Sequence, residues 1–162
     1  MENQLASQFE TLLPLVSSWA REQEQIALSH GVPLSEPELF EARRVGVREP
    51  DKVRLLKVES IPIPSHPLLQ AAIRATNLVP AAPRGLTLNY AIFVRSDCWG
   101  NRPLIVHELV HIAQYERLGG IEQFLRAYLT QCVAVGYKNS AMETEARGTT
   151  GRIYPGIESA KA

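Results

Sequence analysis

Two histidines and a glutamate lie within five residues of one another, in the segment His107-Glu108-Leu109-Val110-His111. In an α-helix, residues four apart lie on the same face one turn apart, so the two imidazoles can bind one metal ion. Glu108 lies about 100° around such a helix from His107, where its carboxylate reaches a water bound to that ion without binding the ion itself. This pattern is typical of metal-assisted hydrolysis, in which zinc activates the water and the carboxylate transfers its proton.

The sequence around this motif predicts a single buried helix over 103–118. Asn101 and Pro103 are typical of a helix start, and the two glycines that follow residue 118 are typical of a helix end. Apolar residues surround the motif on nearly every side, which predicts that the helix is buried. The alternative is a pair of neutral core histidines, with Glu108 paired to an arginine. Two buried histidines with a glutamate between them are costly without a cation, so we favour the metal site.

A zinc site that keeps one position open for water needs a third protein ligand, and two glutamates downstream are candidates. Glu143 and Glu145 belong to a helix expected to begin near Ser140, and about 200° separates them around that helix, so only one can face the metal. We favour Glu143 and keep Glu145 as the alternative. Ser140 and Glu143 also have the spacing of a capping box, in which the carboxylate only satisfies a backbone amide. His30 and His66 remain alternative ligands, although surface or loop positions are expected for both.

Weaker candidates surround the motif. Gln114 lies seven residues after His107 on the same stripe of the helix, where it could hydrogen-bond the second nitrogen of a ligand imidazole; the alternative is a polar residue at the helix rim. The strand expected over 88–95 could pair its backbone with an extended peptide if it lies at the sheet edge. Three tyrosines are candidate donors to a developing oxyanion, although most tyrosines only pack with one end in water: Tyr90, Tyr137 and Tyr154.

The sequence patterns on both sides of the motif predict a helix-rich α+β domain. This domain spans residues 1–162 and contains a short sheet. Residues 86–95 have apolar side chains at every second position and predict a strand, which we expect at the edge of the sheet, flanking the motif helix. Residues 53–61 mix β-branched and apolar side chains and predict a second strand. The segment 86–147 then forms the core that carries the metal site.

Helices are expected on both sides of this core in the sequence. Apolar residues recur with helical spacing within residues 1–30, interrupted at Pro14, which predicts one or two peripheral helices. After the motif helix, a second helix is expected over 121–135, and a third begins near residue 140 and continues past Arg147. Residues 148–162 contain glycine, proline and small side chains, and we expect a loose tail.

From about residue 86 to residue 147, the sequence resembles the zincin metallopeptidases, particularly their gluzincin branch. In small bacterial proteins of that branch, an edge strand precedes an H-E-L-x-H helix, and a glutamate follows on a later helix. The resemblance implies a small zincin-like α+β fold, one zinc ion bound by His107, His111 and Glu143, and Glu108 as the catalytic base. Gluzincins often carry an acidic residue four positions after the ligand glutamate, where this sequence has Arg147.

The balance of charge argues against several classes of partner. Seventeen basic residues balance seventeen acidic ones in 162 residues, so no net field attracts nucleic acid or an anionic membrane. The uncharged stretches fall short of the roughly 18 apolar residues of a membrane span. The N-terminus lacks the positive segment and apolar core of a secretory signal, so we expect a cytoplasmic protein whose two cysteines stay reduced.

These features predict a small zinc-dependent metallopeptidase that hydrolyses a bond in a peptide or protein, with no cofactor beyond one zinc ion. The alternative is a non-catalytic module of the same fold that binds a peptide or protein and has a structural or vestigial metal site. A chain of this size leaves little material for deep specificity pockets, so substrate selection is expected to involve a homo-oligomer, a partner protein or the N-terminal helices.

Overall fold

The computed structural model describes residues 2–157, with side chains from residue 7 onward. This part of the chain forms six α-helices and four strands, joined by loops and three short 3-10 turns. In chain order they are α1 (Glu2–His30), β1 (Val32–Pro33), α2 (Glu36–Arg44), β2 (Arg54–Val58), α3 (Pro67–Thr76), β3 (Gly85–Leu88), β4 (Ala91–Arg95), α4 (Arg102–Leu118), α5 (Ile121–Val135) and α6 (Ala141–Ile153). The predicted helix-rich α+β class with a short sheet is confirmed.

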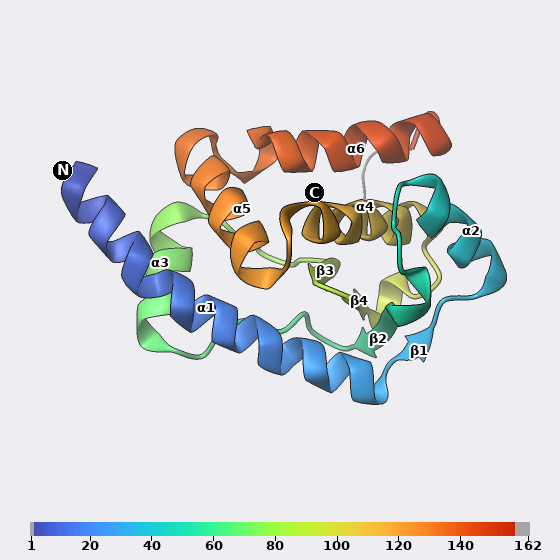
Figure 1. Cartoon of the computed structure of the whole chain (residues 1–162), viewed down its shortest axis with the longest axis horizontal. Helices are drawn as coiled ribbons and strands as arrows, with labels where there is room; N and C mark the ends of the chain where they lie inside the picture. Colours follow the sequence, from blue (N-terminus) through green and yellow to red (C-terminus); the bar gives the residue numbers. More distant parts are fainter. Residues whose placement is uncertain (1, 158–162) are drawn as a thin grey trace.

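The four strands form one mixed sheet in the order β1-β2-β4-β3. β2 pairs with β4 in parallel, from Arg54 opposite Ala91 to Val58 opposite Arg95, and β1 and β3 add to this pair in antiparallel orientation. β3 is therefore an edge strand, and it packs against α4 as expected (Figure 1). β4 is central, and its residues 91–94 are all buried.

The single strand predicted over 86–95 is instead a hairpin of β3 and β4. Asn89 has a φ of 56°, a left-handed conformation that asparagine tolerates better than most residues, and it forms a two-residue turn with Tyr90. The alternation in the sequence continues through this turn because β4 is apolar on both faces. Ile92 and Val94 belong to the core on one side of the sheet, whereas residues 91 and 93 belong to the core on the other side.

Two apolar cores lie on opposite faces of the sheet. α2 and α4 contribute to one core, and α1 and α5 contribute to the other (Figure 1). α1 is a single helix that continues through Pro14 and buries Leu13, Ala20 and Ala27 in the second core. Because these apolar residues recur every seven positions, they face the sheet together, and α1 is a layer of the domain rather than the peripheral addition that we expected.

The last helix is longer than the sequence suggested. α6 continues to Ile153, and Thr150 is buried with its hydroxyl bonded to the carbonyl of Ala146 at 2.8 Å. Residues 148–153, which were expected in a loose tail, are helical because α6 packs against α4, and tertiary packing outweighs weak helix propensity. Residues 158–162 of that tail lie outside the described residues. Within residues 2–157, no helix combines the length and apolarity of a membrane span.

Candidate metal centre

The helix that carries the two histidines runs through the interior of the molecule. α4 begins after Asn101, whose side chain accepts a hydrogen bond from the backbone N of Leu104 at 3.0 Å, and it ends at Gly119, whose φ of 103° is left-handed. Its bounds, Arg102–Leu118, confirm the helix predicted over 103–118. Every residue from 104 to 115 is buried, since α4 packs against both β3 and α6.

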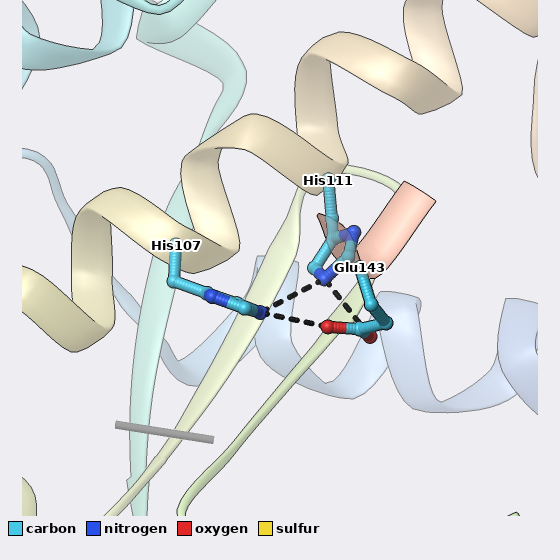
Figure 2. Close-up of side chains that lie close together, drawn as sticks. All are labelled: His107, His111 and Glu143. Atoms are coloured by element: carbon cyan, nitrogen blue, oxygen red, sulfur yellow. Dashed lines mark hydrogen bonds and ion pairs between the residues drawn. The ribbon is translucent and has the colours of Figure 1, made fainter. Parts of the chain in front are cut away.

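His107, His111 and Glu143 converge in this interior, as Figure 2 shows. The Nε2 atoms of the two histidines are 3.3 Å apart. The Glu143 carboxylate places Oε2 3.1 Å from His107 Nε2 and Oε1 3.3 Å from His111 Nε2. The three side chains are at most 2% exposed, so the group is shielded from water. Two elements that are distant in the sequence thus bring three candidate ligands together.

α6 delivers Glu143 from its first turn. Ser140 precedes the helix, and its hydroxyl oxygen accepts a hydrogen bond from the Glu143 backbone N at 3.3 Å. The backbone N–H of Ser140 bonds to the carbonyl of Tyr137, while the Glu143 carboxylate faces the histidines. The serine half of the predicted capping box therefore forms, and the glutamate side chain contributes to the candidate metal centre.

Glu145 lies on the other side of α6, away from the two Nε2 atoms. Its carboxylate accepts hydrogen bonds from Arg117 at 3.1 and 2.9 Å and from Gln114 Nε2 at 2.9 Å. Burial raises the pKa of Glu145, but the hydrogen bonds from Arg117 and Gln114 outweigh burial and leave the pKa below its ordinary value. Of the two glutamates proposed as third ligand, Glu143 is the one that joins the histidines, and Glu145 is an ionised partner of Gln114.

Gln114 determines which nitrogen of His111 carries a proton. The Gln114 amide nitrogen donates to the Met142 carbonyl at 3.0 Å and to the Glu145 carboxylate, both of which only accept. The Gln114 oxygen must then face His111 Nδ1, 2.8 Å away, so this nitrogen is the donor. In the neutral ring the other nitrogen, Nε2, carries a lone pair. That lone pair points at Glu143 and at His107.

This lone pair requires a positive charge beside it. His111 Nε2 and Glu143 Oε1 are both acceptors at 3.3 Å, and only a proton or a metal ion between such groups removes their repulsion. Zinc bonds of about 2.0–2.1 Å in a tetrahedron would set neighbouring ligand atoms about 3.3 Å apart. The observed separations of 3.1, 3.3 and 3.3 Å match that spacing. The buried His-His-Glu group therefore has the donors and the dimensions to hold a metal ion.

Glu108 lies beside this group and is held by the edge strand. Its side chain is fully buried, and its Oε2 accepts a hydrogen bond from the Thr87 hydroxyl of β3 at 2.5 Å. Gly85 lies two residues earlier on the same face of β3, and a Cβ atom there would approach Glu108 Oε1 to 3.0 Å. Sequence reasoning missed both Thr87 and Gly85, because strand spacing alone does not indicate which helical residue a strand faces.

Tyr128 of α5 was also missed, although it contacts a candidate ligand directly. Its hydroxyl donates to Glu143 Oε1 at 2.6 Å. Burial and then the charge of Glu143 raise the pKa of Tyr128 well above its ordinary value, so the hydroxyl stays protonated and available to donate. Two of the three tyrosines proposed as oxyanion donors bond elsewhere: the hydroxyl of Tyr90 bonds to Glu116 and that of Tyr154 bonds to Glu41. The third, Tyr137, lines a cavity together with His111.

A cavity of about 170 Å³ lies beside His111. Its walls come from α1, the segment 61–83, β3 and α5, and Tyr137 also lines it. The two remaining histidines are exposed, and their hydrogen bonds are to residues near them in the sequence. His30 bonds to the Ile26 carbonyl within α1, and His66 accepts from the backbone N of Leu68 at the start of α3. Of the three candidate ligands, His111 lines this cavity, and His30 and His66 form no part of the candidate metal centre.

No family model matches the sequence, and the comparisons with curated proteins and with solved structures found no match. The resemblance to gluzincins therefore stays a prediction. What the site can bind and catalyse has to be argued from the residues of this chain alone.

Proposed function

We propose that this protein is a zinc-dependent hydrolase of peptide bonds, with His107, His111 and Glu143 as the zinc ligands and Glu108 as the base. The observation that carries the proposal is the orientation of His111 by Gln114, which directs a lone pair at the Glu143 carboxylate. Zinc is favoured because two imidazoles and one carboxylate are a donor set of catalytic zinc sites, which keep a fourth position open.

When bound, zinc would lower the pKa of a water molecule and polarise the carbonyl of the scissile bond. The remaining steps belong to side chains of this chain. Glu108 would accept a proton from the attacking water as the oxygen of that water bonds to the carbonyl carbon. The same carboxylic acid would then give the proton to the leaving nitrogen as the carbon–nitrogen bond breaks. Thr87 would keep the Glu108 carboxylate oriented throughout, through its 2.5 Å hydrogen bond.

Metal analysis of matched variants tests this assignment. Protein purified without chelator is expected to contain about one equivalent of zinc. Glu108→Gln should keep that zinc and lose hydrolysis of a peptide library, measured by mass spectrometry, whereas His107→Ala should lose the zinc itself. His30→Ala changes an exposed histidine of α1 and should leave both zinc and hydrolysis unchanged. Less than half an equivalent in the wild type, with no gain when zinc is added, would contradict the site.

A non-catalytic metal site is the second candidate, and burial favours it. His107, Glu108 and Glu143 are all fully buried, which is usual for a structural site and restrictive for a substrate. The Thr87 carbonyl of the edge strand also accepts a hydrogen bond from the Tyr115 hydroxyl at 3.1 Å, so part of the backbone that an extended peptide would pair with is already engaged. A stoichiometric zinc ion together with no cleavage across the peptide library would identify this second function.

A further inference from the structure

The packing of α1, β3, α5 and the segment 61–83 leaves a cavity of about 170 Å³. Protein interiors contain few voids larger than a water molecule, so a space of this size is a candidate binding site. An apolar cavity of about 150 Å³ in another protein binds one benzene molecule. Ile63 lines the present cavity and is 57% exposed, so the space opens to the surface. It has room for one molecule of the size of a single ring.

A stack of aromatic rings lines this cavity. The rings of Tyr115 and Phe124 are parallel to within 11°, with centroids 3.6 Å apart, and those of Phe124 and Tyr128 are parallel to within 15°, at 5.4 Å. Trp19 of α1 and Tyr137, which follows α5, add two more rings to the lining. A flat aromatic molecule gains offset-stacked or edge contacts with such rings, beyond the burial of its surface.

The polar groups of the lining are engaged with the protein itself. The Tyr115 hydroxyl donates to the Thr87 carbonyl at 3.1 Å, the Thr87 hydroxyl donates to Glu108 at 2.5 Å, and the Tyr128 hydroxyl donates to Glu143 at 2.6 Å. No Asp, Glu, Lys or Arg is among the described residues that line the cavity. A charged ligand would lose its water there without gaining a partner, so the lining selects an uncharged, apolar molecule.

The cavity shares little with the candidate metal centre. His111 lines it, whereas His107, Glu108 and Glu143 do not. Both nitrogens of His111 are engaged, since Nδ1 lies 2.8 Å from the Gln114 oxygen and Nε2 lies 3.3 Å from Glu143 Oε1. The carbon atoms of the ring therefore remain for the cavity, and a molecule bound there needs no metal ion.

We propose that this cavity is a second binding site, which takes a free, uncharged molecule with one aromatic ring. The inference goes beyond the proposed function, because this ligand is no part of the bond to be hydrolysed and binds whether or not zinc is present. Recognition consists of burial of the ring and of its contacts with the stacked side chains of α4 and α5.

The two tryptophans of the chain locate the ligand by NMR. Trp19 lines the cavity, whereas Trp99 lines a separate hollow beside β1 and provides an internal reference. Toluene would be titrated into the full chain while the indole N–H resonances are followed. We expect toluene to shift the Trp19 resonance and to leave that of Trp99 unchanged. No binding, or a shift confined to Trp99, would overturn the inference.

Two further probes test the chemistry of the ligand. Benzoate has the same ring as toluene with a charge, and we expect it to bind about ten-fold or more weakly, because its carboxylate gains no partner. Methylcyclohexane has nearly the same size without aromatic character. After correction for the partition of each probe between water and hydrocarbon, toluene should bind roughly two- to ten-fold more tightly. Equal binding of toluene and benzoate, or no corrected preference for toluene, would contradict the assigned ligand class.

Two variants on one helix provide the matched control. Leu129→Trp fills the cavity from α5 and should abolish toluene binding measured by calorimetry, whereas Val133→Trp adds the same side chain at an exposed position one turn further along and should bind toluene like the wild type. If Leu129→Trp does not fold, Leu86→Phe narrows the same cavity from β3. Unchanged affinity in a folded cavity-filling variant would show that toluene binds elsewhere and would overturn the assignment.

Zinc tests whether the two sites are separate. Toluene should bind the wild type equally well in chelator and with one equivalent of zinc, and it should bind His107→Ala like the wild type. Displacement of toluene by zinc, or a need for zinc in its binding, would show that the cavity belongs to the metal centre and would overturn the inference. Selective toluene binding by a protein that never holds zinc supports the inference and contradicts the proposed function alone.

Discussion

Two of the three candidate ligands in this protein, His111 and Glu143, are each oriented by a further side chain. Gln114 fixes the proton on His111 Nδ1, and Tyr128 donates to Glu143 Oε1, which leaves Oε2 beside His107. Such partners commonly change metal affinity by about 10–100-fold when they are removed, because they set the direction and basicity of the ligand. The affinity of the site thus depends on residues that never bind the ion.

Replacing Tyr128 with phenylalanine removes one hydroxyl and almost no volume. We expect Tyr128→Phe to weaken zinc binding by about ten-fold or more, because Glu143 loses the hydrogen bond that orients it. Competition with a chromophoric chelator would measure the change. Tyr90→Phe removes a hydroxyl that bonds to Glu116 and should bind zinc like the wild type. Equal zinc affinity in the two variants would show that Tyr128 does not position the ligand.

Helical geometry explains how much of the site was predictable from sequence. The four-residue spacing predicted that His107 and His111 lie on one face of the helix. The 200° between Glu143 and Glu145 meant that only one of them could face the histidines, and in the structure that residue is Glu143. The contact of Gln114 with a ligand imidazole was predictable from its position on the same stripe of the helix. Tyr128 and Thr87 did not, because they reach the site through the packing of α5 and β3, which no local spacing specifies.

At the scale of elements, the closest approach at the site is that of β3 to α4. Gly85 permits it, since a Cβ atom there would lie 3.0 Å from Glu108 Oε1 and 3.2 Å from Leu104 Cδ1. Both distances are shorter than ordinary van der Waals contact. The strand that contacts Glu108 therefore has a glycine at the point where it crosses the motif helix.

Adding a methyl group at this crossing should destabilise the protein. We expect Gly85→Ala to lower the free energy of unfolding by about 1 kcal/mol, because overpacking costs about 1–3 kcal/mol and replacing a strand glycine returns about 0.5–1 kcal/mol. Gly151→Ala on α6 meets no atom within 4 Å and should instead raise stability by about 0.5–1 kcal/mol. Urea denaturation would measure both, and a change of the same sign in the two variants would contradict the steric argument.

The elements themselves were predicted unevenly, for physical reasons. α4 and α5 carry strong end signals, and their predicted ranges agree with the structure within one residue. The turn at Asn89 was hidden because β4 is apolar on both faces, so the alternation persisted through it. The end of α6 was hidden because Gly148 and Gly151 are poor helix formers that packing against α4 retains in a helix.

At the scale of the whole molecule, the candidate ligands join parts of the chain that are far apart in sequence. His107 and Glu143 are 36 residues apart, and α5 with its two flanking loops lies between them. A metal ion bound by both would link α4 to α6, and unfolding would have to release it. Metal binding and global stability are then coupled.

Zinc should accordingly raise the melting temperature. At a free zinc concentration about 100-fold above the dissociation constant, binding stabilises the folded state by about 2.7 kcal/mol, which corresponds to roughly 5–10 °C for a domain of this size. Calorimetry with and without a chelator would measure the shift. His107→Ala should lose the shift, whereas His66→Ala, an exposed residue at the start of α3, should retain it. An unchanged melting temperature in the wild type would contradict the coupling.

The contacts of Arg117 connect the buried imidazole of His111 to the solvent. Arg117 and Glu145 have side chains that are 58% and 40% exposed, and Glu145 bonds in turn to Gln114, which holds His111. A sulfate ion, a carboxylate of a neighbouring protein or concentrated salt competes for Arg117 on the outside of the molecule. Each of these would change how Arg117 neutralises Glu145, so the ionic composition of the medium would act on His111 through Gln114.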